Sequence, residues 1–279
     1  MTKGVLLFAQ NNTHIDYIKQ AQFCAIRIKK YLDLPICLVT DNVEYLSEYY
    51  PDADFYFDHI VSLDRTQFSQ RKKFKDGLYS EKTLEWRNYS RADAFNLSPF
   101  DETIVMDTDV VLCNSDLLEA FNMNQDFMIA KESKDIKTNR RIDAFRRISD
   151  RSIDMYWATI FYFKKNKNTE MLFDLINHIK ENWNFYRLTY KIVEKKFRND
   201  FAFSIAIHII NGFKKTNWPL PIPGTLWHTI DKDVLVDIQD NSITILLENE
   251  WEYHLANVKD LNVHVMNKFS LGRVIDEQK

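Results

Sequence analysis

The sequence predicts an α/β fold with a Rossmann-like, mainly parallel sheet, flanking helices and an irregular C-terminal part. Strand-length apolar runs alternate with amphipathic segments along the chain, as such a sheet requires. The 279 residues are 45% hydrophobic, so the chain supplies a large core. Five glycines and six prolines lie scattered without a repeat or a low-complexity block. This composition excludes collagen-like, linker-rich and solenoid architectures.

The first 42 residues have the pattern of a β-α-β unit. Gly4–Ala9 is a continuous apolar run of strand length, and Ile36–Thr40 is a second one. Between them, apolar residues recur at spacings of four and three from Tyr17 to Tyr31, which predicts an amphipathic helix. Such units build parallel sheets, and parallel sheets bind ligands at the carboxyl ends of their strands.

Further elements follow the same alternation. We expect strands at 59–61 and 103–106, with a helix over about 82–97 that stops before Ser98-Pro99. Later strands are expected at 127–130 and 155–163, helices at 169–183 and 201–210, and short strands near Val234, Ile243 and Val263. No linker divides the chain, so residues 1–279 are predicted to form a single domain.

Cysteine usage and hydropathy predict a cytoplasmic protein. Cys24, Cys37 and Cys113 lie in apolar stretches without metal-type spacing, which indicates a reducing compartment. The apolar run at the N-terminus is six residues long, and no 18 apolar residues run together. We therefore expect neither a signal peptide nor a membrane span.

The charges are unevenly distributed, although the formal net charge is only −3. Basic residues gather in segments 65–91, 134–151 and 187–198, whereas 41–64 and 231–260 are acidic. If the basic segments share a face, that face attracts polyanions. The alternative is that they form separate solvated loops.

Two aspartates follow a predicted strand. In Asp107-Thr108-Asp109, two carboxylates two residues apart come directly after Ile104-Val105-Met106 and before a second apolar run. Carboxylates with this spacing can face the same side and share Mg²⁺ or Mn²⁺ beside a bound phosphate. The alternative is a turn that caps a short helix at residues 114–116.

The surrounding segments resemble a known family. Tyr89–Asp93, Ser98–Asp101 and Ile104–Val111 are similar to the donor-binding core of nucleotide-sugar glycosyltransferases of the glycosyltransferase A fold. The similarity is strongest to the retaining family that contains glycogenin and bacterial galactosyltransferases. It implies a metal-dependent hexosyl- or pentosyltransferase. Residues 1–131 would then bind the nucleotide sugar, and 132–279 would form the acceptor side.

The resemblance also implies roles for single residues. Asp107 and Asp109 would hold Mn²⁺ or Mg²⁺ against the diphosphate, with His264 as a third ligand and Lys268 as a phosphate contact. In this chain His264 and Lys268 are closer together than in the family, and no glycine lies between them. His264 has an alternative role as a core residue on a strand.

Other contacts follow from the same resemblance. The nucleoside of the donor, expected to be UDP-linked, would lie near Gln10, Asn11 and Asp41 at the ends of two strands. Arg91 would contact the diphosphate or pair with an acid on its own helix.

On the acceptor side, Asp200 would orient or deprotonate the acceptor hydroxyl. Its alternative role is as the N-cap of a helix. Trp157 and Thr159 replace the family's Asn and Gly in the strand that touches the donor sugar, so the sugar is left open.

The acceptor is also open. The opening residues Gly4–Gln10 and the compact length resemble transferases of tailed phages that glycosylate hydroxymethylcytosine in DNA, and the basic segments would suit such an acceptor. Sugars, lipid-linked groups and protein hydroxyls are alternatives. Two other function classes remain: a metal-dependent nucleotidyl or phosphoryl transferase, and a non-catalytic nucleic-acid-binding protein.

Overall fold

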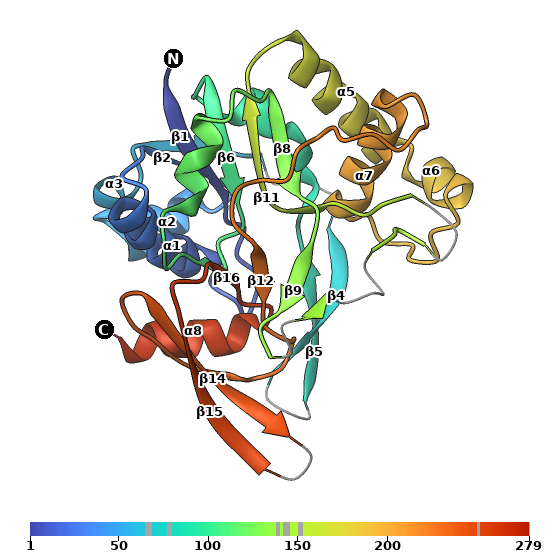
Figure 1. Ribbon diagram of the computed structural model, residues 1–279. Coiled ribbons are helices and arrows are strands. Elements are labelled where there is room, and N and C mark those ends of the chain that lie inside the picture. Colours follow the sequence, from blue (N-terminus) through green and yellow to red (C-terminus); the bar gives the residue numbers. More distant parts are fainter. Residues whose placement is uncertain are drawn as a thin grey trace.

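The computed structural model confirms the predicted class. A central, mainly parallel sheet is flanked by helices, and shorter sheets make up the C-terminal part (Figure 1). The structure describes residues 1–64, 69–76, 80–137, 140–141, 146–149, 153–249 and 252–278.

The central sheet has six strands in the order β3-β2-β1-β6-β11-β8. Its strands are β1 (Lys3–Phe8), β2 (Ile36–Thr40), β3 (His59–Ser62), β6 (Glu102–Met106), β8 (Phe127–Ala130) and β11 (Trp157–Lys164). β1 pairs in parallel with β2 on one side and with β6 on the other, whereas β11 runs antiparallel to β6 and β8. The strand order therefore reverses at β1, and a crevice for ligands opens at such a point beyond the carboxyl ends.

Helices cover both sides of this sheet (Figure 1). On one side lie α1 (Tyr17–Tyr31), α2 (Val43–Tyr49) and α3 (Ala53–Tyr56); on the other lie α5 (Lys167–Glu181), α6 (Trp183–Thr189) and α7 (Asn199–Ile210). Local sequence sets their starts: the Asp16 carboxylate accepts a hydrogen bond from Lys19 N, and Asn166 with Thr169 forms a capping box.

A second sheet has five very short strands in the order β10-β9-β12-β16-β7. They are β7 (Val110–Val111), β9 (Ser133–Asp135), β10 (Arg140–Arg141), β12 (Leu226–His228) and β16 (Val263–His264). β7 follows the Asp107–Asp109 turn and pairs with β16, so it joins this turn to the C-terminal part of the chain.

The C-terminal part packs beside this second sheet (Figure 1). β13 (Leu235–Ile238), β14 (Ser242–Asn249) and β15 (Glu252–Lys259) form an antiparallel sheet, and α8 (Lys268–Glu277) follows β16. Apolar side chains of these elements bury a separate small core with Val111 and Cys113. A 3-10 helix, η2 (Asp116–Phe121), lies between β7 and β8.

The prediction of a helix over residues 82–97 is wrong. The chain forms a β-hairpin of β4 (Gln70–Lys75) and β5 (Glu81–Trp86), then η1 (Tyr89–Asp93) and α4 (Ala94–Leu97). The hairpin buries Phe74 and Leu84 against Ile15, which lies 69 residues before Leu84 in the sequence. A helix over residues 82–97 would break the pairing of β4 with β5 that brings Phe74 and Leu84 together. Tertiary packing therefore overrides the local helical pattern.

The cysteines are free and buried, as expected for small apolar residues. Burial raises the pKa of the Cys24 and Cys37 thiols to about 12. Within the part of the chain that the structure describes, no helix has both the length and the apolar character needed to cross a membrane.

Candidate active site

A cavity of about 550 Å³ lies beyond the carboxyl ends of β1 and β6, where the strand order reverses. Phe8 and Gln10 extend from β1, and Asp107 follows β6. The β4–β5 hairpin, the start of α7, and the loops after β12 and β16 complete its wall. The cavity therefore occupies the position that the β-α-β pattern predicts for a ligand.

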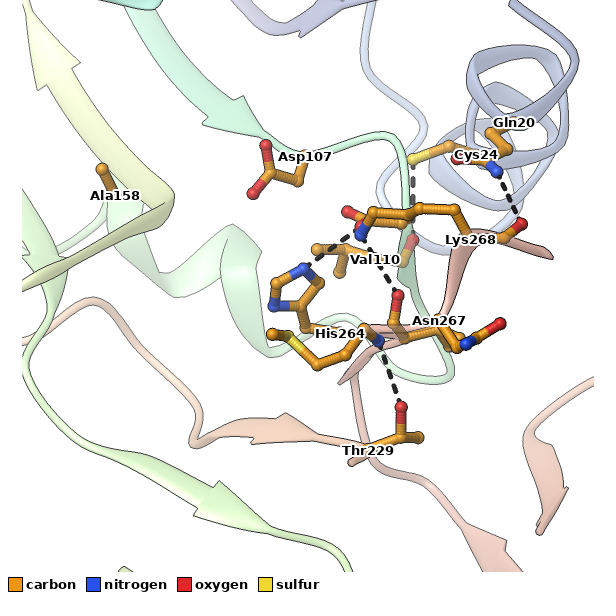
Figure 2. A network of polar contacts seen from close by, with 12 residues as sticks. Gln20, Cys24, Asp107, Val110, Ala158, Thr229, His264, Asn267 and Lys268 are labelled. Carbon is orange, nitrogen blue, oxygen red and sulfur yellow. Dashed lines mark hydrogen bonds and ion pairs between the residues drawn. The ribbon is translucent and has the colours of Figure 1, made fainter. Parts of the chain in front are cut away.

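Three predicted metal ligands meet in this cavity. Ligand atoms of Asp107, Asp109 and His264 all lie within 4.8 Å of one another. Two carboxylates and an imidazole form a donor set that suits Mn²⁺ or Mg²⁺ with further oxygen ligands from a substrate. Figure 2 shows Asp107 after β6, with His264 and Lys268 on the neighbouring C-terminal elements.

Backbone pairing explains why residues so distant in sequence meet. The turn after β6 is closed by a hydrogen bond from Val110 N to Asp107 O (3.1 Å), and β7 begins at Val110. β16 then pairs with β7 so that His264 lies opposite Val110. The His264 Nε2 atom comes within 3.2 Å of Asp109 Oδ2.

Cations neutralise both carboxylates. Arg91 forms an ion pair with Asp107 and also donates to Ala158 O, and Lys268 forms an ion pair with Asp109. Arg91 therefore pairs with Asp107 and not with an acid on its own helix. Its contact with a diphosphate stays a prediction. A phosphate bound at this cluster would find both cations beside it.

Burial shifts the pKa values of two basic groups in the cavity. It lowers the pKa of His264, which favours the neutral imidazole that binds metals. It also lowers the pKa of Lys268 to about 7, and the nearby charges of Lys72 and Arg91 act in the same direction. Several cations thus share a small, partly dehydrated space.

Asp200 lines the cavity, but it is not a helix cap. The residue before α7 is Arg198, and Asp200 lies in the first turn of that helix. Its carboxylate accepts a hydrogen bond from Ala158 N (2.9 Å) and pairs with Arg198 (2.7 Å). The N-cap interpretation is wrong, because the carboxylate is turned toward β11.

Gln10 lies in the cavity wall, whereas Asn11 and Asp41 lie outside its lining. The Asn11 side chain accepts a hydrogen bond from Ile18 N (3.0 Å) and donates one to Asp16. The Asp41 side chain is fully buried and forms an ion pair with Arg87, which does line the cavity. Direct nucleotide contacts of Asn11 and Asp41 stay predictions.

Several lining residues were not singled out from the sequence. They include Lys72, Trp86, Arg87, Thr229 and Asp231. For Lys72 and Arg87, the signal in the sequence was the excess of basic residues in segment 65–91. Trp157 is buried in the wall and stacks on His228, with 6.2 Å between the ring centroids.

The basic segments reach the cavity unevenly. Segment 65–91 contributes Lys72, Arg87 and Arg91, and segment 187–198 contributes Lys196 and Arg198. Residues 65–68 and 77–79 of the first segment lie outside the described residues, as does much of segment 134–151.

No protein-family model and no curated protein matches the chain. Among solved structures, it is similar to the glycosyltransferase GlyE of Streptococcus pneumoniae, with a TM-score of 0.43, 13% identity and coverage of 75% of this chain and 43% of GlyE. Bifunctional IspDF from Campylobacter jejuni has a TM-score of 0.37 and 11% identity, with coverage of 74% of this chain and 47% of IspDF. The galactosyltransferase LgtC has a TM-score of 0.41 and 10% identity, with coverage of 72% of this chain and 70% of LgtC. The chain thus spans less than half the length of GlyE and IspDF.

Proposed function

We propose that the protein is a metal-dependent glycosyltransferase that moves a hexosyl or pentosyl group from a nucleoside-diphosphate sugar to an acceptor hydroxyl. The observation that carries this proposal is the Asp107–Asp109–His264 cluster inside a cavity at the carboxyl edge of the sheet. The resemblance of residues 89–111 to a donor-binding core also supports it.

In this proposal Asp107, Asp109 and His264 hold Mn²⁺ or Mg²⁺. When bound, such an ion neutralises the charge that develops on a departing diphosphate. Arg91 and Lys268 add positive charge from the protein side. Breaking a glycosyl–phosphate bond requires this neutralisation, because the electron pair of the bond stays with the diphosphate.

Asp200 is the proposed acceptor-side residue. Its carboxylate is held by Ala158 and Arg198 in the cavity wall, where it can accept a hydrogen bond from an acceptor hydroxyl. Gln10, on the other side of β6, is the proposed contact for the nucleoside.

The set of metal-binding side chains favours glycosyl transfer over nucleotidyl or phosphoryl transfer. Those reactions typically use a further carboxylate near the metals or a glycine-rich phosphate loop. Among the described residues, the third member of the metal-binding group is a histidine. The five glycines of the sequence lie singly.

We also propose a UDP-linked donor and double-stranded DNA with hydroxymethylated cytosine as the first acceptor to test. Support for the DNA comes from cations at and near the cavity: Lys196 lines it, and Lys191 and Lys195 are exposed close by in sequence. Lysines at such positions neutralise phosphates without reading sequence.

The test is a panel of nucleotide sugars incubated with the protein and Mn²⁺, with release of nucleoside diphosphate as the readout. We expect slow hydrolysis of one donor, its loss on chelation, and stimulation by hydroxymethylated DNA but not by unmodified DNA. Calorimetry with nucleoside diphosphates and Mn²⁺ measures binding directly. Absence of any binding to the wild-type protein would refute the proposal.

Asp109→Asn is expected to abolish metal-dependent nucleotide binding, because it removes a carboxylate from the cluster. Asp107→Asn is the second variant, since each substitution leaves a different cation without its ion-pair partner: Lys268 after loss of Asp109, and Arg91 after loss of Asp107. Asp174→Asn on the exposed side of α5 is the matched control and should bind as the wild type does. Unchanged binding in both Asp107→Asn and Asp109→Asn would contradict the assignment.

A further inference from the structure

The β4–β5 hairpin presents one lysine to the cavity. Side chains alternate along a strand, so Lys72 and Phe74 share a face of β4, and both line the cavity. Arg71 and Lys73 lie on the opposite, exposed face, where Lys73 pairs with Glu81 (2.9 Å). Of these three neighbouring cations, Lys72 is therefore the one directed inward.

The hairpin is attached on both sides of the cavity. Near the metal cluster, Asn267 Nδ2 donates to Lys75 O (2.8 Å). On the acceptor side, the Gln70 side chain donates to Phe197 O (2.9 Å) and accepts from Phe197 N (2.8 Å). Lys72 lies between these two attachments, so its position is set by packing and hydrogen bonds.

Lys72 differs from Lys268 and from the arginines that line the cavity. Arg91, Lys268 and Arg198 each pair with an aspartate. For the Lys72 ammonium group, the described part of the chain supplies neither an ion pair nor a hydrogen bond. Its Nζ atom instead lies 5.4 Å from the ring centroid of Phe74 and 5.1 Å from that of Trp86.

The surroundings of Lys72 penalise its charge. Burial is the main cause that lowers its pKa, and the charge of Arg198 lowers it further. The charges of Asp231, Asp200 and Asp107 act in the opposite direction but do not reverse the shift. A half-buried ammonium group without a carboxylate partner is costly unless an anion joins it. In the free protein, the Lys72 ammonium group is therefore available to pair with a bound anion.

Lys72 lines the same cavity as His264 and Lys268 on one side and Asp200 and Arg198 on the other. It acts on Lys268 and His264 at the metal cluster, and it interacts with Asp200 and Arg198 on the acceptor side. In a bound sugar nucleotide, the phosphate that carries the sugar is the group between these two sides.

We propose that Lys72 binds the sugar-bearing phosphate of the donor and donates a hydrogen bond to one of its oxygens. This inference rests on the proposed function. It adds a substrate-contacting residue from the hairpin, and this residue holds the terminal phosphate of the diphosphate after the sugar has left.

The test compares UDP with UMP in calorimetry with Mn²⁺, because UMP lacks the terminal phosphate; if the donor panel identifies another base, its diphosphate and monophosphate replace them. Lys72→Met is expected to weaken diphosphate binding roughly tenfold or more and to leave monophosphate binding nearly unchanged. Lys72→Arg should restore most of the loss, because it returns the charge. Donor hydrolysis should fall in parallel in Lys72→Met.

Lys73→Met, one residue away on the exposed face, is the matched control and should bind both nucleotides as the wild type does. Thermal unfolding establishes that each variant is folded. Equal diphosphate affinity in Lys72→Met and wild type would overturn the inference, and so would equal weakening for both nucleotides. Either result leaves the proposed function standing, whereas a wild-type protein that binds no nucleoside diphosphate removes the function itself.

Discussion

The six-stranded sheet and the five-stranded sheet differ in how their strands are built. The strands of the first are four to eight residues long, and β2 and β6 are buried along their whole length. Those of the second are two or three residues long. Yet the second sheet contains His264, and β7 directly follows Asp109.

This difference indicates that the six-stranded sheet supplies most of the stability, whereas the five-stranded sheet positions residues of the candidate site. Long apolar strands are stabilised by their own burial, whereas strands of two residues depend on the elements around them. Asp107, Asp109 and His264 therefore meet where short strands from distant parts of the chain lie at the edge of the six-stranded sheet. A rigid scaffold with the reacting groups at its edge is the general arrangement of α/β ligand sites.

The largest expected effect on stability comes from the first sheet. The Phe161 side chain in β11 is fully buried and packs against Phe127, Phe173 and Phe203, with 4.8 Å between the ring centroids of Phe161 and Phe203. Phe161→Ala should lower the free energy of unfolding by about 3–5 kcal/mol, because it leaves a cavity among these rings. Urea unfolding measures this change.

The exposed Phe213 supplies the control for this comparison. Its side chain is 67% accessible, so Phe213→Ala should change the free energy of unfolding by less than about 0.5 kcal/mol. A similar loss in both variants would show that stability is not concentrated at the central sheet.

An intermediate effect is expected where α1 meets the C-terminal part. The buried Arg27 guanidinium donates to Leu112 O (2.6 Å) and to Gln239 O (3.3 Å). Arg27→Met should lower the free energy of unfolding by about 2 kcal/mol, because it removes charge-assisted hydrogen bonds to buried carbonyl groups. Arg71→Met, at an exposed position, should leave stability unchanged in the same measurement. Equal stability of Arg27→Met and wild type would contradict the role of Arg27 as a link between these parts.

The smallest expected effect in free energy, yet the most specific, comes from the second sheet. His264→Asn should weaken Mn²⁺ binding on the order of tenfold, about 1.4 kcal/mol, because the cluster loses its imidazole ligand. Its unfolding free energy should change less than that of Phe161→Ala. Titration of Mn²⁺ in the presence of the bound nucleotide measures the affinity.

His254→Asn is the corresponding control, since His254 lies exposed on β15 and pairs with Glu252. Equal Mn²⁺ affinity in wild type and His264→Asn would exclude the histidine from the metal site. A loss in His254→Asn would show that the effect does not arise at the cluster.

Much of the first sheet was predictable from local sequence. The expected helix from Tyr17 to Tyr31 and the strand Ile36–Thr40 match α1 and β2, because a buried run and a helical spacing are each encoded within one segment. The Asp107–Asp109 pair was found in the same way, from two acids at the end of an apolar strand. The single-domain organisation stays a prediction.

Sequence alone therefore determined the periodic elements of the central sheet and the acids at its edge, since hydrophobic spacing is a local property. Tertiary structure decided the rest: the β4–β5 hairpin in place of a helix, the turn of Asp200 toward β11, and the pairing of Lys268 with Asp109. These features depend on contacts between residues far apart in the chain. Their free energy comes from packing and charge pairing in the folded state, and no local pattern encodes it.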